Sequence, residues 1–145
     1  MNLVDVNVLI YAVNSDSPHH EKARRWLENA LSGSESLGFA WTVVLAFLRV
    51  TTRRGILEQP LAVPAAIAYI DSWLQQPNVE IVEPDDHHWR ILRTLIASAG
   101  TAGNLTSDAH LAALALGGGW ILVSTDHDFR RFAGLSVVNP LATSS

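Results

Sequence analysis

The opening stretch, Met1 to Ile10, constrains the fold most, because a short apolar run in it ends directly on a carboxylate at Asp5. A second apolar run follows, with Asn7 near its start. A buried strand that ends at Asp5 would produce this pattern, and open α/β sheets bind ligands at the carboxyl ends of their strands. The pattern returns late in the chain, where an apolar run to Val123 precedes Ser124 and Asp126. We therefore expect two strands that bring acids to one edge of a sheet.

Short apolar segments alternate with segments of helical period along the rest of the chain. Strands are predicted at 3–5, 37–39, 79–82, 120–123 and 136–138, and helices at 7–13, 19–31, 41–53, 64–76, 87–99 and 109–116. This alternation predicts an α/β fold with a central parallel sheet of four to five strands, flanked by helices on both faces. The chain has 145 residues and no visible repeat or linker, so we expect a single domain over residues 1–145.

The apolar stripes of the helices predict which side chains face the core. The helix from Trp41 to Arg53 is apolar over most of its surface, so burial on several sides is predicted. The tryptophans mostly fall on such stripes and are predicted to be core residues. The inward positions of two further helices are Val63, Ile67, Ile70 and Leu74 in the first, and Trp89, Leu92, Ile96 and Ala99 in the second.

Composition excludes several classes of protein. The chain is 48% hydrophobic and 17% charged, which is enough for a full core. The absence of cysteine excludes a disulfide scaffold, a thiolate zinc site and a cysteine nucleophile. The net charge of −4 is unlike a generic nucleic-acid coat, so any nucleic-acid role must be local. We see no signal-peptide pattern and no apolar run of about 18 residues, which favours a cytoplasmic protein without a membrane span.

Three acids are placed differently from the solvated ones. Asp5 and Asp126 each follow an apolar strand, and Asp108 lies in the first turn of an apolar helix. In a parallel sheet all three can point into one cleft, where their mutual repulsion raises their pKa values and costs stability. A divalent cation relieves that repulsion, and oxygen ligands favour Mg²⁺ or Mn²⁺. Such a cation can activate water for attack on a phosphate.

Each of these acids also has a purely structural interpretation. Asp108 can be only a helix cap, and Asp126 only a turn residue. Asp5 is harder to explain in this way, since an acid at the end of a buried strand is costly without a partner. Asp128 is either an additional ligand or a cap for the turn at Phe129.

Several neighbouring residues are predicted either to support the site or to have an ordinary structural role. Asn7 and Ser124 either donate hydrogen bonds into the cleft or satisfy the backbone. Arg49, Arg53 and Arg54 are candidate phosphate ligands at the cleft rim or ordinary solvated cations. The adjacent histidines, His19-His20 and His87-His88, are interpreted as surface or cap residues, and packing is the favoured role of His110 and His127.

Three blocks carry a resemblance to a known family. They are Asp5-Val6-Asn7-Val8-Leu9, the run from Thr106 to Ala113 that contains Asp108, and Ser124-Thr125-Asp126-His127-Asp128-Phe129. In order and spacing they resemble the acidic motifs of PIN domains over essentially the whole chain. The stretch Trp41 to Thr52, with Phe47-Leu48-Arg49-Val50, resembles the branch of VapC toxins common in mycobacteria and other actinobacteria.

The resemblance implies a Mg²⁺-dependent RNA endonuclease, the toxin of a type II toxin–antitoxin system that inhibits translation and growth. It makes Asp5, Asp108 and Asp126 the catalytic metal ligands. It also implies a VapB-type antitoxin whose C-terminal segment enters the acidic groove, structured RNA targets such as tRNA or rRNA, with mRNA also open, and a homodimer.

One position departs from the family pattern. Most PIN domains carry a Glu on the third helix, where this sequence has Ala46-Phe47, and no carboxylate occurs between Trp41 and Ile56. The number of metal ions is therefore open, and a PIN-like fold that only binds RNA or protein is an alternative. A haloacid-dehalogenase-like phosphatase also opens with strand-Asp, but it needs an acid where Asn7 stands and a lysine at the site. A receiver domain fails on the same lysine, because Lys22, the only lysine, lies on a polar helix face.

Overall fold

The computed structural model describes residues 1–142 and has a parallel sheet of five strands. The order across the sheet is β3-β2-β1-β4-β5. The strands are β1 (Asn2–Val4), β2 (Leu37–Ala40), β3 (Val79–Val82), β4 (Ile121–Val123) and β5 (Val137–Val138). The helices are α1 (Val6–Val13), α2 (His20–Ser32), α3 (Trp41–Thr52), α4 (Val63–Leu74), α5 (His88–Ala99) and α6 (Thr106–Gly118), with short 3₁₀ turns η1 (Gly103–Leu105) and η2 (His127–Arg131). The predicted α/β class and five strand positions are confirmed, with shifts of at most one residue at the strand ends.

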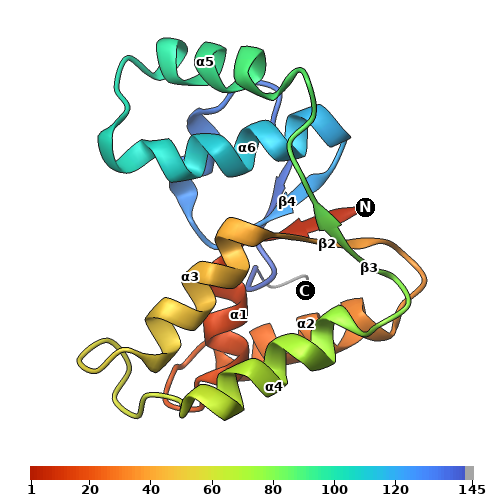
Figure 1. The fold of residues 1–145 in the computed structure, drawn as a ribbon, viewed down its shortest axis with the longest axis vertical. Coiled ribbons are helices and arrows are strands. Elements are labelled where there is room, and N and C mark those ends of the chain that lie inside the picture. Colours follow the sequence, from red (N-terminus) through yellow and green to blue (C-terminus); the bar gives the residue numbers. More distant parts are fainter. Residues whose placement is uncertain (143–145) are drawn as a thin grey trace.

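The helices form two layers. The chain moves outward from β1 to β2 and β3, then returns across the sheet to β4 on the other side of β1. Because parallel crossovers are right-handed, this reversal places the connections of the two halves on opposite faces. Figure 1 shows α5 and α6 above the sheet and α1, α2, α3 and α4 below it. The predicted cover of helices on both faces is therefore confirmed.

The reversal occurs at β1 and β4, which lie side by side in the middle of the sheet. Their register pairs Val4 with Val123, so the next residues along each strand, Asp5 and Ser124, leave the same edge together. The Asp5 N–H donates to the Val123 carbonyl over 2.9 Å and extends the pairing to the edge of the sheet. Strand ends at such a switch point border a crevice.

A buried apolar core anchors these strand ends. Leu3, Val4, Leu122 and Val123 have essentially no exposed surface. Burying side chains of this size contributes about 1.5–3 kcal/mol each. The polar groups that follow them are therefore held in place by strands that cannot shift without exposing core.

Helix α4 packs through a face that only partly matches the predicted one. Ile70 is buried and Leu74 is partly buried against the core, as predicted, but Val63 and Ile67 are exposed. The buried positions are Ala66, Ile70 and Trp73. The reason is Trp73, whose ring lies 6.1 Å from the Phe39 ring and 5.0 Å from the Phe47 ring. The large aromatic contact turns the helix and moves the smaller β-branched and aliphatic side chains outward.

Tryptophan burial was also predicted wrongly at two positions. Trp89 is 66% exposed and Trp41 is exposed, whereas Trp73 and Trp120 are buried. On α5 the buried position is Leu95, and the predicted Leu92, Ile96 and Ala99 are partly buried against the core. Of the predicted stripe only Trp89 faces outward, because it lies about 120° around the helix from Leu95 at about 100° per residue. Helix α3 is buried through Val43, Val44, Phe47 and Thr51, but Trp41 and Leu45 face outward, so its predicted burial holds on one side only.

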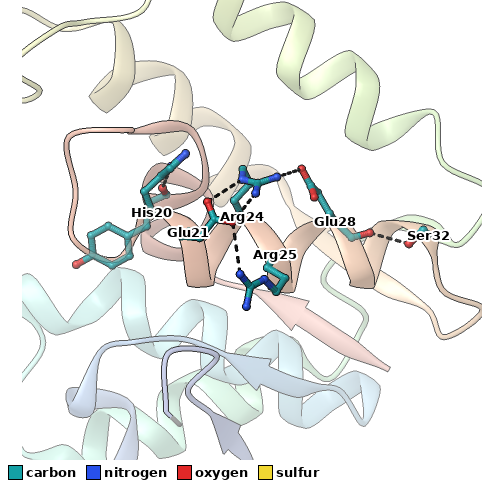
Figure 2. Close-up of polar contacts among 7 residues, drawn as sticks. His20, Glu21, Arg24, Arg25, Glu28 and Ser32 are labelled. Carbon is teal, nitrogen blue, oxygen red and sulfur yellow. Dashed lines mark hydrogen bonds and ion pairs between the residues drawn. The ribbon is translucent and has the colours of Figure 1, made fainter. Parts of the chain in front are cut away.

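Helix α2 carries a polar network on its outer surface (Figure 2). Arg24 bridges Glu21 and Glu28, with a distance of 2.7 Å to Glu28, and Arg25 lies 3.6 Å from Glu21. The His20 ring contacts the Tyr11 carbonyl over 2.9 Å. Solvent and salt screen exposed ion pairs of this kind, so this network supports the helix only weakly and takes no part in the cleft described below. None of the helices within residues 1–142 has the length and apolar character needed to cross a bilayer.

Candidate functional site

Asp5 is buried at the end of β1, with 7% of its surface exposed. It serves as the N-cap of α1, since one carboxylate oxygen accepts the Val6 N–H over 2.8 Å. The other oxygen accepts the Ser124 hydroxyl over 2.7 Å. Burial raises the pKa of Asp5, the two hydrogen bonds lower it, and the charge of Asp126 raises it again. The hydrogen bonds explain how an acid is tolerated at this depth.

Ser124 connects Asp5 to the acids after β4. Its hydroxyl donates to Asp5, and its oxygen accepts the Asp126 N–H over 3.0 Å. Asp126 in turn caps η2, because its carboxylate accepts the Asp128 N–H over 2.9 Å. Ser124 is almost fully buried, so this chain of hydrogen bonds fixes the path of the backbone between the two strand ends.

The Asp108 side chain lies near Asp126 and Asp128, and it comes from α6, in the helix layer above the sheet. It lies in the first turn of α6, and one oxygen each from Asp108, Asp126 and Asp128 lie within 4.8 Å of one another. Asp5 is outside this close group, although its charge acts on Asp108. The structure therefore brings Asp108, Asp126 and Asp128 together, and Asp5, just after the end of β1, lies close enough for its charge to act on Asp108.

Electrostatic repulsion at this cluster is strong enough to shift a pKa. The pKa of Asp108 is raised to about 6, first by burial and then by the charges of Asp126, Asp5 and Asp128. Arg131 opposes the shift and lies 3.7 Å from Asp128. A pKa shift caused by burial and like charges in a cleft is a property of functional sites.

These residues fit a divalent cation. Carboxylate oxygens from separate elements, held within a few Å, form the ligand set that hard cations such as Mg²⁺ and Mn²⁺ take. Cation binding would remove the repulsion that raises the pKa of Asp108. Asp128, Asp126 and Asp108 offer the free oxygens, and the oxygens of Asp5 are partly committed to Val6 and Ser124.

A cleft of about 350 Å³ opens in front of Asp5 and Asp108. Helix α3 forms its opposite wall, because it starts directly after β2 at the same edge of the sheet. The lining residues from α3 are Thr42, Val43, Leu45, Ala46 and Arg49. Ala46 therefore faces the cleft, whereas Phe47 is fully buried against Trp73. Of the two positions where the family pattern has a Glu, only Ala46 borders the site.

The three arginines singled out in the sequence separate in space. Arg49 lines the acidic cleft. Arg53 follows the end of α3, and Arg54 lines a different hollow with Gly55 and Leu57. Arg131, which acts on the acids directly, had no signal in the sequence beyond its place in the first turns after Asp126.

The structure also places the predicted histidines His88 and His110, and Asn7. His88 is half-buried, not a surface residue, and its Nε2 lies 2.9 Å from Nδ1 of His110. Burial and the neighbouring His88 lower the pKa of His110. This pair joins α5 to α6, consistent with the packing role expected for His110. Asn7 is half-buried in the first turn of α1, and its contribution to the cleft stays a prediction.

Comparison with known proteins decides the family. Residues 3–135 match the PIN domain model. Ribonuclease VapC37 of Mycobacterium tuberculosis is 46% identical over 142 residues, which cover 98% of this chain and 99% of that protein. Ribonuclease VapC33 of the same species is 37% identical, with 97% and 99% covered.

The chain belongs to the VapC family of PIN-domain ribonucleases. The fold agrees with solved VapC structures: VapBC2 from Rickettsia felis, bound to a DNA fragment from its promoter, matches with a TM-score of 0.69. The identity to that chain is 16%, and 95% of this chain and 97% of that chain are covered. Membership of the VapC family replaces the phosphatase and receiver-domain alternatives, so the acidic cleft is that of a PIN-domain nuclease.

Proposed function

We propose that this VapC-family ribonuclease is the toxin of a type II toxin–antitoxin system and cleaves RNA phosphodiester bonds with Mg²⁺ or Mn²⁺. The observation that carries the proposal is the meeting of Asp108, Asp126 and Asp128 in front of buried Asp5. Like charges gathered in this way are a cost unless they hold a cation. Cleavage of tRNA, rRNA or mRNA would stop translation and growth.

The residues have separate roles in this proposal. Asp108 and Asp126, with Asp128, would hold the cation, and Asp5 would complete the site from the end of β1. Ser124 would orient Asp5 through its 2.7 Å hydrogen bond, which lowers the pKa of Asp5 against the larger effect of burial, and Asn7 would be a further hydrogen-bond donor toward the cleft. A bound Mg²⁺ or Mn²⁺ supplies a more acidic water and charge stabilisation at the phosphate.

Protonation sets the pH range of this site. Metal ligands must be deprotonated, and Asp108 has a pKa of about 6 without a cation. We therefore expect cation affinity to fall as the pH drops through about 6. We expect RNA cleavage to be fastest at neutral and alkaline pH, where Asp108 is ionised.

The proposal extends to partners and location. Solved structures of this fold include toxin–antitoxin complexes, which supports a VapB-type antitoxin as the partner of this chain. We also propose a homodimer, a cytoplasmic location and one PIN domain over residues 1–145. The PIN domain match over residues 3–135 supports the last of these.

Replacement of single acids tests the catalytic assignment. We expect Asp5→Asn and Asp108→Asn to lower RNA cleavage in Mg²⁺ by at least about 100-fold, since even groups that only orient metal ligands are worth about 10–100-fold. Asp71→Asn, on the exposed face of α4, is the matched control and should cut like the parent. Cleavage should also stop in excess EDTA and return with Mg²⁺ or Mn²⁺.

Two outcomes would contradict the proposal. Parent-like cleavage by both acid variants would remove these acids from the reaction. RNA binding by the parent with no cleavage under any of these conditions would favour the alternative of a non-catalytic PIN-like domain, for which the absence of an acid at Ala46 is the structural argument.

A further inference from the structure

Arg49 occupies a distinctive position in the acidic cleft. It lies on the wall formed by α3, and Asp5 and Asp108 lie on the other side. Thr42, Val43, Leu45 and Ala46 are uncharged, so Arg49 is the only charged residue that α3 contributes to the lining. Leu45, one helical turn before Arg49, is 57% exposed. A ligand in this cleft would therefore meet acids on one side and a largely apolar surface with one guanidinium on the other.

The acids repel the phosphates of an RNA substrate, so RNA binding in this cleft requires a cation that offsets their negative charge. Asp5 and Asp108 line the cleft, and Asp126 and Asp128 lie next to Asp108, so the four acids bring a formal charge of −4 to this region when ionised. One divalent cation leaves a net negative charge, which repels a phosphodiester anion. A guanidinium on the facing wall reduces this repulsion and can form two parallel hydrogen bonds to phosphate oxygens.

Arg131 is less suited than Arg49 to offset the repulsion between the acids and an RNA phosphate. It lies 3.7 Å from Asp128 and lowers the pKa of Asp108, so its charge is already used by the acids. Among residues 1–142, Arg49 forms no ion pair with a carboxylate. The sequence of α3 explains this, because no Asp or Glu occurs from Trp41 to Ile56.

The missing acid on α3 and the free arginine are connected. Ala46 and Arg49 both line the cleft and stand three residues apart, the spacing at which helical side chains pair. A Glu at position 46 would lie within reach of the guanidinium and neutralise it. With alanine there, the charge of Arg49 stays available to a ligand.

We propose that Arg49 is a phosphate-binding residue of this site, holding a phosphodiester of the RNA between α3 and the acids. The inference rests on the proposed ribonuclease function. It separates Arg49 from Arg53 and Arg54, which lie outside the cleft lining. It also assigns to α3 a substrate-binding role in place of the acidic role that the common family pattern has there.

The test compares Arg49→Ala and Arg49→Lys with Arg53→Ala, an exposed arginine at the end of the same helix. RNA affinity is measured by fluorescence anisotropy with a labelled mixed-sequence oligoribonucleotide, in the Asp5→Asn background with Mg²⁺ so that no cleavage occurs. For Arg49→Ala we expect about tenfold weaker binding and a slope of log affinity against log salt that is smaller by about 0.7–0.9. Arg49→Lys should keep the salt slope and recover part of the affinity, since lysine keeps the charge without the planar fork.

A second pair of measurements separates substrate binding from metal binding and folding. In the otherwise unchanged protein, Arg49→Ala should raise KM about tenfold, while its Mn²⁺ affinity by titration calorimetry and its Tm stay like the parent's. RNA affinity and salt slope equal to those of Arg53→Ala would overturn the inference, and so would a loss confined to Mn²⁺ affinity. If Asp108→Asn abolishes cleavage but Arg49→Ala has no effect, only this inference fails. If Asp108→Asn cuts normally, the proposed function fails as well.

Discussion

The two walls of the cleft are built on different principles. On one side, which we call the acid wall, Asp5, Ser124, Asp126 and Asp128 are linked by hydrogen bonds. A carboxylate oxygen of Asp108, from α6, lies within 4.8 Å of oxygens of Asp126 and Asp128. On the other side, α3 presents threonine, aliphatic side chains and a single arginine without hydrogen bonds to the acids. Burial and the mutual repulsion of the acids in this wall raise the pKa of Asp108. This difference supports the proposals that the acid wall binds a cation and that the α3 wall binds an anionic ligand.

The acid wall depends on Ser124 more than on any other uncharged residue. We expect Ser124→Ala to destabilise the metal-free protein by about 2 kcal/mol at pH 8, because it removes a hydrogen bond to a buried charged carboxylate. The pKa of Asp5 should rise further, so the loss should shrink as the pH is lowered and Asp5 becomes protonated. Urea unfolding at pH 8 and pH 5 measures both effects.

Ser98→Ala is the control for this variant, since Ser98 is exposed on α5. It should change stability by less than about 0.5 kcal/mol. Equal stability of Ser124→Ala and Ser98→Ala at pH 8 would mean that the hydrogen-bonded acid wall is not as rigid as its geometry implies.

Much of the acid wall could be predicted from the sequence because it follows from strand geometry. Asp5 directly follows β1, Asp126 follows β4 after two residues, and parallel strands end at the same edge. The closeness of Asp128 to Asp108 could not be predicted, because it depends on how η2 turns after Asp126. The pairing of Arg131 with Asp128 has the same origin, since it requires the path of a turn whose conformation no periodic pattern specifies.

The α3 wall and the outer helix faces were harder to predict. A helix that is apolar all round, such as α3, does not reveal which side faces the core. The exposed position of Leu45 and Trp41 depends on how α3 packs against α1 and α4. The inward sides of α4 and α5 were hard to predict for a similar reason. On α4 the packing of Trp73 against Phe47 leaves Ile67 exposed, and on α5 a small rotation of the helix leaves Trp89 exposed.

An acid placed on the α3 wall would sharpen the comparison. We expect Ala46→Glu to bind Mn²⁺ about tenfold more tightly, since it adds a carboxylate to the lining that already holds Asp5 and Asp108. The same change should weaken RNA binding, because the new carboxylate pairs with Arg49. Titration calorimetry with Mn²⁺ and anisotropy with RNA read the two effects separately. Ala46→Gln has a similar size without the charge, and tighter Mn²⁺ binding by that variant would contradict the electrostatic explanation.

Asp108 allows the smallest and most direct test of strain in the acid wall. Its pKa of about 6 in the folded protein lies above the usual value for Asp, so between about pH 4 and pH 6 the folded state binds more protons than the unfolded state. Stability must therefore fall as the pH rises through this window, and it stays lower above it. Because Asp108 is only half-buried, solvent screening reduces the effect to about 1 kcal/mol.

In EDTA at pH 8, Asp108→Asn should raise Tm by about 3 °C, and the gain should vanish near pH 4. Mg²⁺ should reverse the order at pH 8, since it stabilises the parent by binding to the acids and has less effect on the variant. A variant that is less stable than the parent in EDTA at pH 8 would mean that Asp108 contributes to folding as a helix cap, and that the repulsion at the acid wall is relieved within the protein itself.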